Sequence, residues 1–519
     1  MFRTKREYKI SASEDWVSPR GEGPVRSRVY VEETLLDSSS EYQDLEVPIS
    51  NFIFRSSFFI AAALCILVLA FIFDLSIRRY GYFADISLQN KSVNFSVPPP
   101  RGIIFDRLGR PLVVNEPVFD LLVISKEVGE ANENTDKVAD ILGKKRVEFQ
   151  TFISEGIKNS SVFFAESGLD KNQVLEIKTL DPKGFYVVPN TKRRYIDGSQ
   201  FSQILGYVGK ISEKELGIDG YYYPTDIIGR LGVEAQYEEY LRGEHGRIFF
   251  SAGGETSPLR GGRENLSVDP VTGNSIVLNI DHDMQKRLFN ELFNVLRDSN
   301  YSKATAIIQD PQTGAVLAMA SFPTYDNNLF VGGLSDSQFR SLFENKSRPL
   351  FNRAISGLYN PGSTIKPFMG LMALEENIFS PSDTIRDCVG LTIINPYNPD
   401  DAYTFDNWRV EYGLFNLKRA IANSCNVYFF IAGGGSPTGS RDYGGIKGLG
   451  VERIANYLRS AFADSKLGID LPGEEDGFVP TPEWKLAARG ESWYQGDTYN
   501  ISIGQGDLLI TPLWLNSYV

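Results

Sequence analysis

The sequence predicts a multidomain α/β protein that is held to a membrane by a single helix. Its 519 residues exceed the size of one ordinary hydrophobic core, so two or three folded units are expected. One uncharged apolar run, at 56–73, is just long enough to span a bilayer. Elsewhere, β-branched runs alternate with stretches of helical periodicity, which indicates domains that mix helices and strands.

Composition argues against two classes of function. The formal net charge of -12 argues against nucleic acid as a partner, because phosphate binding requires a basic surface. The chain contains two histidines, His245 and His282, and neither stands in a recognisable catalytic context. A Ser-His-Asp triad is therefore not expected, and a serine enzyme of this sequence would need another base.

The N-terminal region predicts a tail and an anchor. Residues 1–55 mix Ser, Glu, Arg and Lys with few apolar clusters, which is typical of a solvated, disordered segment. A transmembrane helix is predicted over 56–77. Its apolar run is longer than a usual signal-peptide core and lacks a small-residue cleavage site, which disfavours a signal peptide. Flanking arginines lie on both sides, so the positive-inside rule leaves the orientation open.

Two folded units are predicted after the anchor. Short β-branched runs and polar helical stretches make 78–265 a mixed α and β domain. A Gly-, Ser- and Pro-rich stretch at 251–275 predicts a connection. The second domain, over 270–519, is expected to open with a strand at 275–281, a helix from His282 and a β-hairpin at 304–323, as in an α/β domain whose sheet is covered by helices.

The segment YNPGSTIKPF carries the first candidate catalytic residues. Ser363 and Lys366 stand three residues apart, just after a Pro-Gly pair where a helix is predicted to begin, so they share one helix face. A serine at a helix N-terminus lies at the positive end of the dipole, which favours an oxyanion formed beside it. Lysine can accept the serine proton only when neutral, so we expect a lowered pKa in a buried, cation-lined cleft.

A second serine motif supports this interpretation. Ser-x-x-Lys by itself is also a common surface pattern of helices, but NPGSTIKP is apolar and bounded by prolines. Downstream, in ANSCNVYFF, Ser424 and Asn426 lie between a helical run and an apolar one. Both side chains could project from a short break into a cleft, where Ser424 would relay a proton and Asn426 would orient a substrate amide.

These motifs resemble the signature of the penicillin-binding proteins, in which Ser-x-x-Lys is followed by a Ser-x-Asn-type triplet and Lys-Thr-Gly. RGIIFDRLGRPL, at 101–112, is similar to the box that opens the pedestal domain of the class B proteins, with Leu108 in place of the usual Asn. GRLGVEAQYEEYLRGEHG, at 229–246, resembles a second segment of that domain. GFVPTPEWK and SWYQGDTYNISIGQGDLLITPL look like the elongation-type proteins rather than the division-type ones.

The resemblance implies a penicillin-sensitive peptidoglycan D,D-transpeptidase of the bacterial inner membrane. Its parts would be a cytoplasmic tail (1–55), one transmembrane helix (56–77), a pedestal or dimerisation domain (78–265) and a periplasmic, serine β-lactamase-like transpeptidase domain (270–519). Ser363 would attack the D-Ala-D-Ala carbonyl of a stem peptide and pass the acyl group to an amine on a neighbouring strand. The implied partners are stem peptides and lipid-linked precursor, β-lactams as inhibitors, the membrane and a SEDS-family glycosyltransferase; no cofactor is implied.

The sequence departs from the family at its end. No Lys-Thr-Gly follows Ser424, and the chain stops at Val519, a few residues after the segment that usually precedes that strand. The expectation is a truncated chain whose transpeptidase domain lacks its C-terminal strands and one oxyanion donor. This polypeptide as written would then be unstable or inactive.

Two cysteines near the second motif leave three states open. Some elongation-type relatives hold zinc near this loop with Asp, Cys and His side chains, and Cys388, Asp406 and Cys425 fall at suitable places. Tyr412 and Gly413 stand where the histidine would be expected, and structural zinc normally has four ligands. Zinc, a Cys388–Cys425 disulfide and two unlinked thiols all remain open, and the unlinked thiols are the expectation.

Other functions share some of these features. A β-lactamase would have the serine and lysine without a pedestal or a membrane helix, and a membrane-bound β-lactam sensor would carry a more complex membrane region. A non-catalytic scaffold of a cell-wall synthesis complex would fit the missing third motif. Survival of cells whose full-length gene carries Ser363→Ala would favour the scaffold over the enzyme.

Overall fold

The computed structural model describes residues 51–79, 92–128, 133–212, 214–216, 220–251, 268–394, 398, 402–437 and 443–519. The chain divides into two compact units, residues 1–90 and 91–519, and each is considered by itself. The disordered tail expected over 1–55 lies outside the described residues, except for 51–55, which are helical.

The first unit contains the predicted membrane helix. Helix α1 runs over Asn51–Phe73 and continues as a π-helical turn, η2, over Asp74–Arg78. Most of its apolar side chains are exposed within the part of the chain that the structure describes. The segment Arg55–Ile77 is long and apolar enough to cross a bilayer, and the described residues hold no second helix of this kind. A helix is therefore present where one was predicted over 56–77, and it begins slightly earlier. That it spans a membrane stays a prediction.

The second unit begins with a five-stranded sheet built around one long strand. Strand β3 (Pro111–Ile124) pairs antiparallel with β5 (Phe185–Tyr195), β4 (Val162–Leu169) and β2 (Ile104–Phe105). Its C-terminal half, FDLLVI, is rich in apolar side chains that are completely buried. Burial on both sheet faces explains why this stretch is continuously apolar and not alternating.

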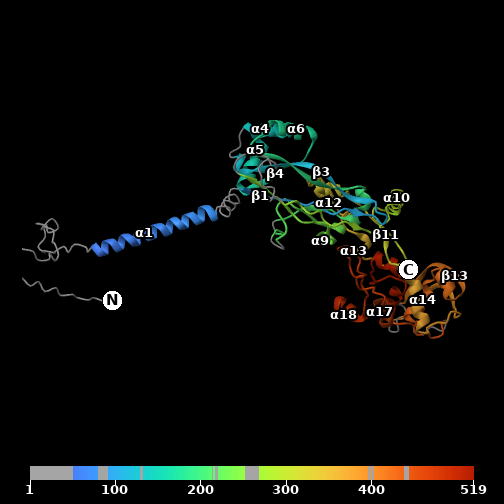
Figure 1. Ribbon diagram of the computed structural model, residues 1–519. Coiled ribbons are helices and arrows are strands. Elements are labelled where there is room, and N and C mark those ends of the chain that lie inside the picture. Colours follow the sequence, from blue (N-terminus) through green and yellow to red (C-terminus); the bar gives the residue numbers. More distant parts are fainter. Residues whose placement is uncertain are drawn as a thin grey trace, which may run out of the picture. The chain divides into compact units, whose positions relative to one another are not determined.

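Helices cover one part of this sheet. Helices α4 (Glu133–Ile141), α5 (Arg146–Asn159) and α6 (Lys171–Leu180) pack on one another and on β4 and β5, and Figure 1 shows them grouped beside β4. Their shared core contains Val138, Phe149 and Ile153. The other elements before residue 252 are β1 (Ser92–Val97), α3 (Ser125–Val128), α7 (Gly198–Leu205), β6 (Val208–Lys210), β7 (Ile227–Gly229), α8 (Gly232–Gln236), α9 (Glu238–Leu241) and β8 (Gly246–Ser251), with β1 paired to β8 and β6 to β7.

One strand lies in a different sheet from the one predicted. Strand β9 is only Ile276–Val277, and it runs parallel to β2 at the edge of the five-stranded sheet. The sequence pattern placed this strand at the opening of the second domain. An isolated strand pattern carries no information about its partner, which is why the sheet was assigned wrongly. Most of the connection predicted at 251–275 lies outside the described residues.

The next predicted elements are confirmed. Helix α10 spans His282–Arg297, and strands β10 (Ala304–Gln309) and β11 (Val316–Phe322) form an antiparallel hairpin on which it packs. The remaining elements are α11 (Asn328–Val331), α12 (Asp336–Phe343), α13 (Arg353–Ser356), the 3-10 turn η3 (Gly362–Ile365), α14 (Lys366–Glu375), β12 (Ile385–Ile393), β13 (Tyr403–Phe415), α15 (Leu417–Ala422), α16 (Asn426–Gly434), α17 (Val451–Ser460), α18 (Pro482–Arg489), α19 (Gln495–Ser502) and α20 (Pro512–Tyr518).

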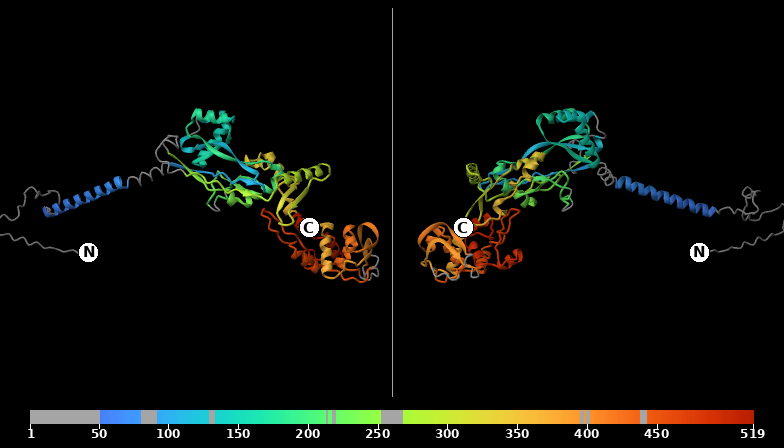
Figure 2. Two further views of the ribbon diagram at one scale, coloured as in Figure 1. Left: turned by 45° about the vertical axis from the view of Figure 1, so that its right-hand side comes forward. Right: turned by 180° about the vertical axis from the view of Figure 1, so that it is seen from behind.

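Helix α16 is the centre of the second half of this unit. It packs against α14, α17, α19 and both strands of the β12–β13 hairpin, and Figure 2 shows these orange and red elements grouped together in both views. Its residues from Val427 to Gly433 are all buried, so the helix is apolar all round, as expected for a core helix. Because its sides are fixed by packing, its N-terminal residue, Asn426, has a defined position.

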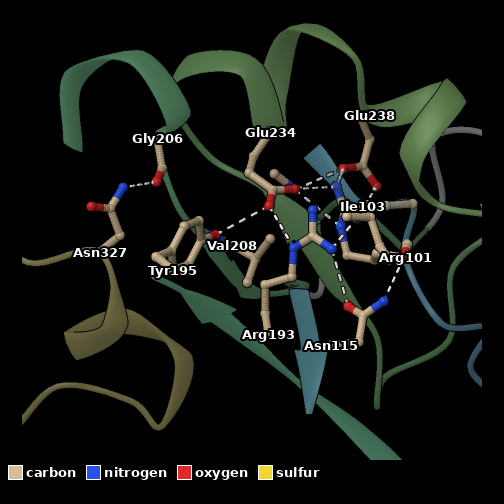
Figure 3. A network of polar contacts seen from close by, with 12 residues as sticks. Arg101, Ile103, Asn115, Arg193, Tyr195, Gly206, Val208, Glu234, Glu238 and Asn327 are labelled. Atoms are coloured by element: carbon tan, nitrogen blue, oxygen red, sulfur yellow. Dashed lines mark hydrogen bonds and ion pairs between the residues drawn. The ribbon is translucent and has the colours of Figure 1, made fainter. Parts of the chain in front are cut away.

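A buried ionic cluster joins two segments that the sequence analysis singled out separately. Arg101, from the first pedestal-like box, donates to Glu234 (Nη2 to Oε2, 2.9 Å) and to Glu238 (Nη2 to Oε2, 2.7 Å) in the second. Arg193 donates to the other oxygen of Glu234 at 2.7 Å, and Tyr195 also donates to that oxygen (Figure 3). Burial alone would raise the pKa of Glu234, but Arg193 and Arg101 outweigh it and hold that pKa below its usual value.

Candidate active site

The segment that carries Ser363 is a single 3-10 turn held by its neighbours. The turn spans Gly362–Ile365 and leads directly into α14, and the Ser363 side chain is exposed. The amide of Gly362 donates to the carbonyl of Gly504 at 2.8 Å. A Cβ at Gly504 would lie 2.2 Å from the carbonyl oxygen of Gly362, so only glycine permits this approach. The serine is thus presented to solvent on a fixed backbone.

Lys366, by contrast, is buried at the first residue of α14. Its side chain is 2% exposed, and its Nζ donates to three oxygens: the Ser424 carbonyl at 2.9 Å, Ser424 Oγ at 3.0 Å and Asn426 Oδ1 at 2.6 Å. Burial lowers its pKa from the usual range to about 8. The lowered pKa expected from the sequence is therefore present, and burial suffices as its cause without the cationic lining that was also expected.

The second motif lies in a break between two helices. Helix α15 ends at Ala422 and α16 begins at Asn426, as the alternation of helical and apolar runs predicted. Within the break Ser424 has φ of 51°, in the left-handed region that residues with a Cβ seldom adopt. This conformation turns both the carbonyl and the hydroxyl of Ser424 toward Lys366. Backbone strain at such a position is typical of functional sites.

The structure therefore brings three of the four predicted residues into direct contact. Lys366, Ser424 and Asn426 form one hydrogen-bonded group, and Ser363 lies one turn before Lys366. Among the described residues, no hydrogen bond joins Ser363 Oγ to Lys366 Nζ. The side-chain oxygen of Asn426 accepts from the lysine, and its Nδ2 donates to the carbonyl of Asp406 at 3.3 Å. Its role in orienting a substrate amide stays a prediction.

The two cysteines near this motif form a disulfide, so the expectation of two unlinked thiols is wrong. Cys388 on β12 and Cys425, the residue between Ser424 and Asn426, are bonded with a Cα–Cα distance of 5.8 Å. Both are completely buried. Sequence separation gave no indication of this contact, because the packing of α16 on β12 brings the two residues together only in the folded chain. Among the described residues, no cluster of His, Cys, Asp and Glu could hold a metal ion.

Sequence reasoning missed one polar residue of this region. Asn407 on β13 accepts a hydrogen bond from the Asn426 amide at 2.8 Å and donates through Nδ2 to the carbonyl of Cys388 at 3.1 Å. An asparagine in a polar strand carries no recognisable motif, so only its position beside the second motif reveals it. The histidines lie in other settings, His245 paired with Asp226 and His282 with Asp197, both at 2.8 Å.

Comparison with known families assigns both halves of the second unit. Residues 96–278 match the penicillin-binding protein dimerisation domain, and residues 304–519 match the penicillin-binding protein transpeptidase domain. A dimerisation domain followed by a transpeptidase domain is the organisation of the class B penicillin-binding proteins, and the chain belongs to this family.

Its relatives define the group more closely. The peptidoglycan D,D-transpeptidase MrdA of Acinetobacter baumannii is 32% identical over 476 residues, which cover 89% of this chain and 66% of that protein. The penicillin-binding protein PBP2 of Helicobacter pylori, in its complex with MreC, has a TM-score of 0.65 and 27% identity, over 82% of this chain and 75% of that one. A peptidoglycan synthase complex that coordinates polymerization and crosslinking contains a chain with a TM-score of 0.59 and 27% identity, over 90% and 76%.

Within the family, the chain is therefore of the penicillin-binding protein 2 type. It spans about two thirds of the length of the curated relatives that it matches, for example 66% of the Acinetobacter protein.

Proposed function

We propose that the protein is a serine peptidoglycan D,D-transpeptidase, with Ser363 as nucleophile and Lys366 as base. Two domains are proposed, a pedestal over 78–265 and a catalytic domain from residue 270. The observation that carries the proposal is a buried lysine whose pKa lies near 8 and whose amine is oriented by Ser424 and Asn426. A surface lysine of a Ser-x-x-Lys pattern would be exposed and fully charged at neutral pH.

The reaction follows from these positions. Neutral Lys366 accepts the proton of Ser363 as its Oγ forms a bond with the carbonyl carbon of the penultimate D-alanine of a stem peptide. The C–N bond to the terminal D-alanine then breaks, and the departing amine takes a proton from Lys366 by way of the Ser424 hydroxyl. An amine of a neighbouring stem peptide then attacks the ester carbonyl carbon and loses a proton to Lys366. The ester C–O bond breaks, and Ser363 Oγ leaves and takes that proton back. A β-lactam would react in the first step and leave an acyl group on Ser363.

The first test is covalent labelling. Membranes of cells that express the full-length gene are expected to show a band labelled by a fluorescent penicillin, and Ser363→Ala is expected to abolish it because the acyl group has no oxygen to bond to. Ser382→Ala, which removes an exposed hydroxyl after α14, is the matched control and should label like the wild type. Equal labelling of Ser363→Ala would refute the assignment of the nucleophile.

The pH dependence of labelling is the second test. With a pKa of about 8, Lys366 is neutral in about one tenth of molecules at pH 7 and in about nine tenths at pH 9. Since only the neutral amine accepts a proton, the acylation rate is expected to rise with pH through about 8 and then level off. Initial labelling rates measured across this range would show it. A rate independent of pH would mean that deprotonation of Lys366 does not limit acylation.

The setting of this activity is part of the proposal. Helix α1 would anchor the protein in the inner membrane as a single span, with the catalytic domain in the periplasm. The Cys388–Cys425 disulfide supports this orientation, because structural disulfides form outside the reducing cytoplasm. Stem peptides and lipid-linked precursor would be its substrates. MreC is a proposed partner by likeness to the relative solved with it. A SEDS-family glycosyltransferase is the other proposed partner, as the family resemblance implies.

A further inference from the structure

Strand β13 runs beside the segment that orients Lys366. Three successive residues of this strand bind it: Trp408 Nε1 donates to the Asn423 carbonyl at 3.2 Å, Arg409 Nη2 donates to Asn423 Oδ1 at 3.2 Å, and Asn407 Oδ1 accepts from the Asn426 amide at 2.8 Å. The first two contacts hold the end of α15. The third holds the start of α16, whose first residue contacts the lysine amine.

The Asn407 side chain uses both ends of its amide. Its Nδ2 donates to the Cys388 carbonyl at 3.1 Å and to the Arg409 carbonyl at 2.6 Å, while Oδ1 faces the Asn426 amide. Since a backbone amide can only donate and carbonyls can only accept, these neighbours fix which end of the side chain points where. A single side chain thus links β12, β13 and the N-terminus of α16.

The hydrogen bond from the Asn426 amide to Asn407 satisfies a donor that has no partner within helix α16. The first amides of an α-helix have no partner within the helix, and that of Asn426 is the first of α16. The N-cap residue, Cys425, offers only a sulfur, which accepts from the Tyr428 amide at 3.5 Å and is a weak acceptor. Asn407 therefore supplies the polar cap of α16 from another strand.

The position of the Asn426 amide determines the position of the proposed base. Asn426 Oδ1 accepts from Lys366 Nζ at 2.6 Å, and the preceding Ser424, in its left-handed conformation, supplies the other two oxygens. A rotation of this backbone would move all three oxygens together. We propose that Asn407 is a positioning residue of the active site, which acts through Asn426 to hold the Lys366 amine for proton transfer. This inference rests on the proposed transpeptidase function.

Because of the Cys388–Cys425 disulfide, an experiment can distinguish a positioning role of Asn407 from a role in folding. Cys425 is covalently joined to Cys388 of β12, so the Ser424 to Asn426 segment stays attached to the β12–β13 hairpin when the Asn407 side-chain amide is removed. The α16 core below it is apolar and does not involve Asn407. Loss of Asn407 should therefore change the orientation of the segment without unfolding the domain.

The experiment compares acylation kinetics of Asn407→Ala with the wild type, in membranes of cells that produce each protein. Labelling at several fluorescent-penicillin concentrations separates the dissociation constant from the acylation rate constant. We expect the rate constant to fall between about tenfold and a hundredfold, as for small misplacements of a catalytic group. The dissociation constant and the temperature at which labelling is lost should match the wild type.

Two further variants sharpen the comparison. Asn407→Asp keeps an oxygen for the Asn426 amide, so it should recover part of the rate that Asn407→Ala loses. Thr392→Val removes one exposed hydroxyl, and with it the hydrogen bond to Thr404, from the same hairpin and should label like the wild type.

The outcomes separate this inference from the function on which it rests. Wild-type labelling at Ser363 together with an unchanged rate constant in Asn407→Ala would overturn the positioning role alone. A parallel loss of affinity, rate and heat resistance would also overturn it, since the residue would then be only structural. Absence of labelling at Ser363 in the wild type would overturn the proposed function itself.

Discussion

Replacement of Lys366 by methionine is expected to lower the rate of acylation by a penicillin about a thousandfold, within the usual range for removal of a general base. Methionine has a similar length and fits a buried site, so the loss would come from the missing amine. Lys366→Arg should be equally slow, because a guanidinium keeps the charge but does not release its proton at these pH values. Acylation rates of purified protein, followed with a fluorescent penicillin, provide the measurement.

The control for this prediction is an exposed lysine on a nearby helix. Lys418 in α15 is exposed, and Lys418→Met should react like the wild type. Substantial activity of Lys366→Arg would contradict the role of Lys366 as base and would assign it to electrostatic stabilisation instead.

The second large effect is expected in the buried ionic cluster of the pedestal. Glu234→Gln should destabilise the protein by about 3 to 5 kcal/mol, because removal of one partner leaves buried charge without compensation. Both Arg193 and Glu234 have completely buried side chains, and Arg101 is nearly so. The amide of glutamine cannot serve as an anionic acceptor for two guanidinium groups. Urea unfolding of the purified protein, followed by tryptophan fluorescence, measures the change.

An exposed pair in the same domain is the matched control. Arg194 is paired with Glu116 on neighbouring strands, and their side chains are 56% and 43% exposed. Glu116→Gln should change the free energy of unfolding by no more than about 1 kcal/mol, as for other surface ion pairs. If Glu234→Gln changed the free energy of unfolding as little as Glu116→Gln, the cluster would contribute little to stability. The charged residues of the segments 101–112 and 229–246 would then need another explanation.

Local patterns in the sequence predicted those parts of the fold that depend on neighbouring residues. The apolar run gave α1, the spacing of apolar residues gave α10, and the alternation of strand and turn residues gave the β10–β11 hairpin. The two strands of a hairpin are close in the chain, so their pairing follows from the turn between them. Strand β9 was assigned to the wrong sheet, because its partner β2 lies far away in the sequence.

The sequence likewise predicted the part of the site whose residues are close together in the chain. Ser363 and Lys366 share one turn, so their proximity is a property of local backbone geometry. That the second motif faces the lysine could be expected only from the resemblance, since Lys366 and Ser424 belong to separate helices. The Cys388–Cys425 disulfide was favoured less than free thiols, and Asn407 was not considered. Both depend on the packing of β12 and β13 against the start of α16.

The sequence by itself determined the family, the candidate nucleophile and base, and a helix long and apolar enough to cross a membrane, because each depends on residues that are adjacent or a few positions apart. Only the tertiary structure decided how Lys366 is buried, and burial by segments distant in the chain lowers its pKa to about 8. It also decided what holds the Ser424 to Asn426 segment in place: a disulfide and an asparagine from a strand pair whose register no short motif specifies.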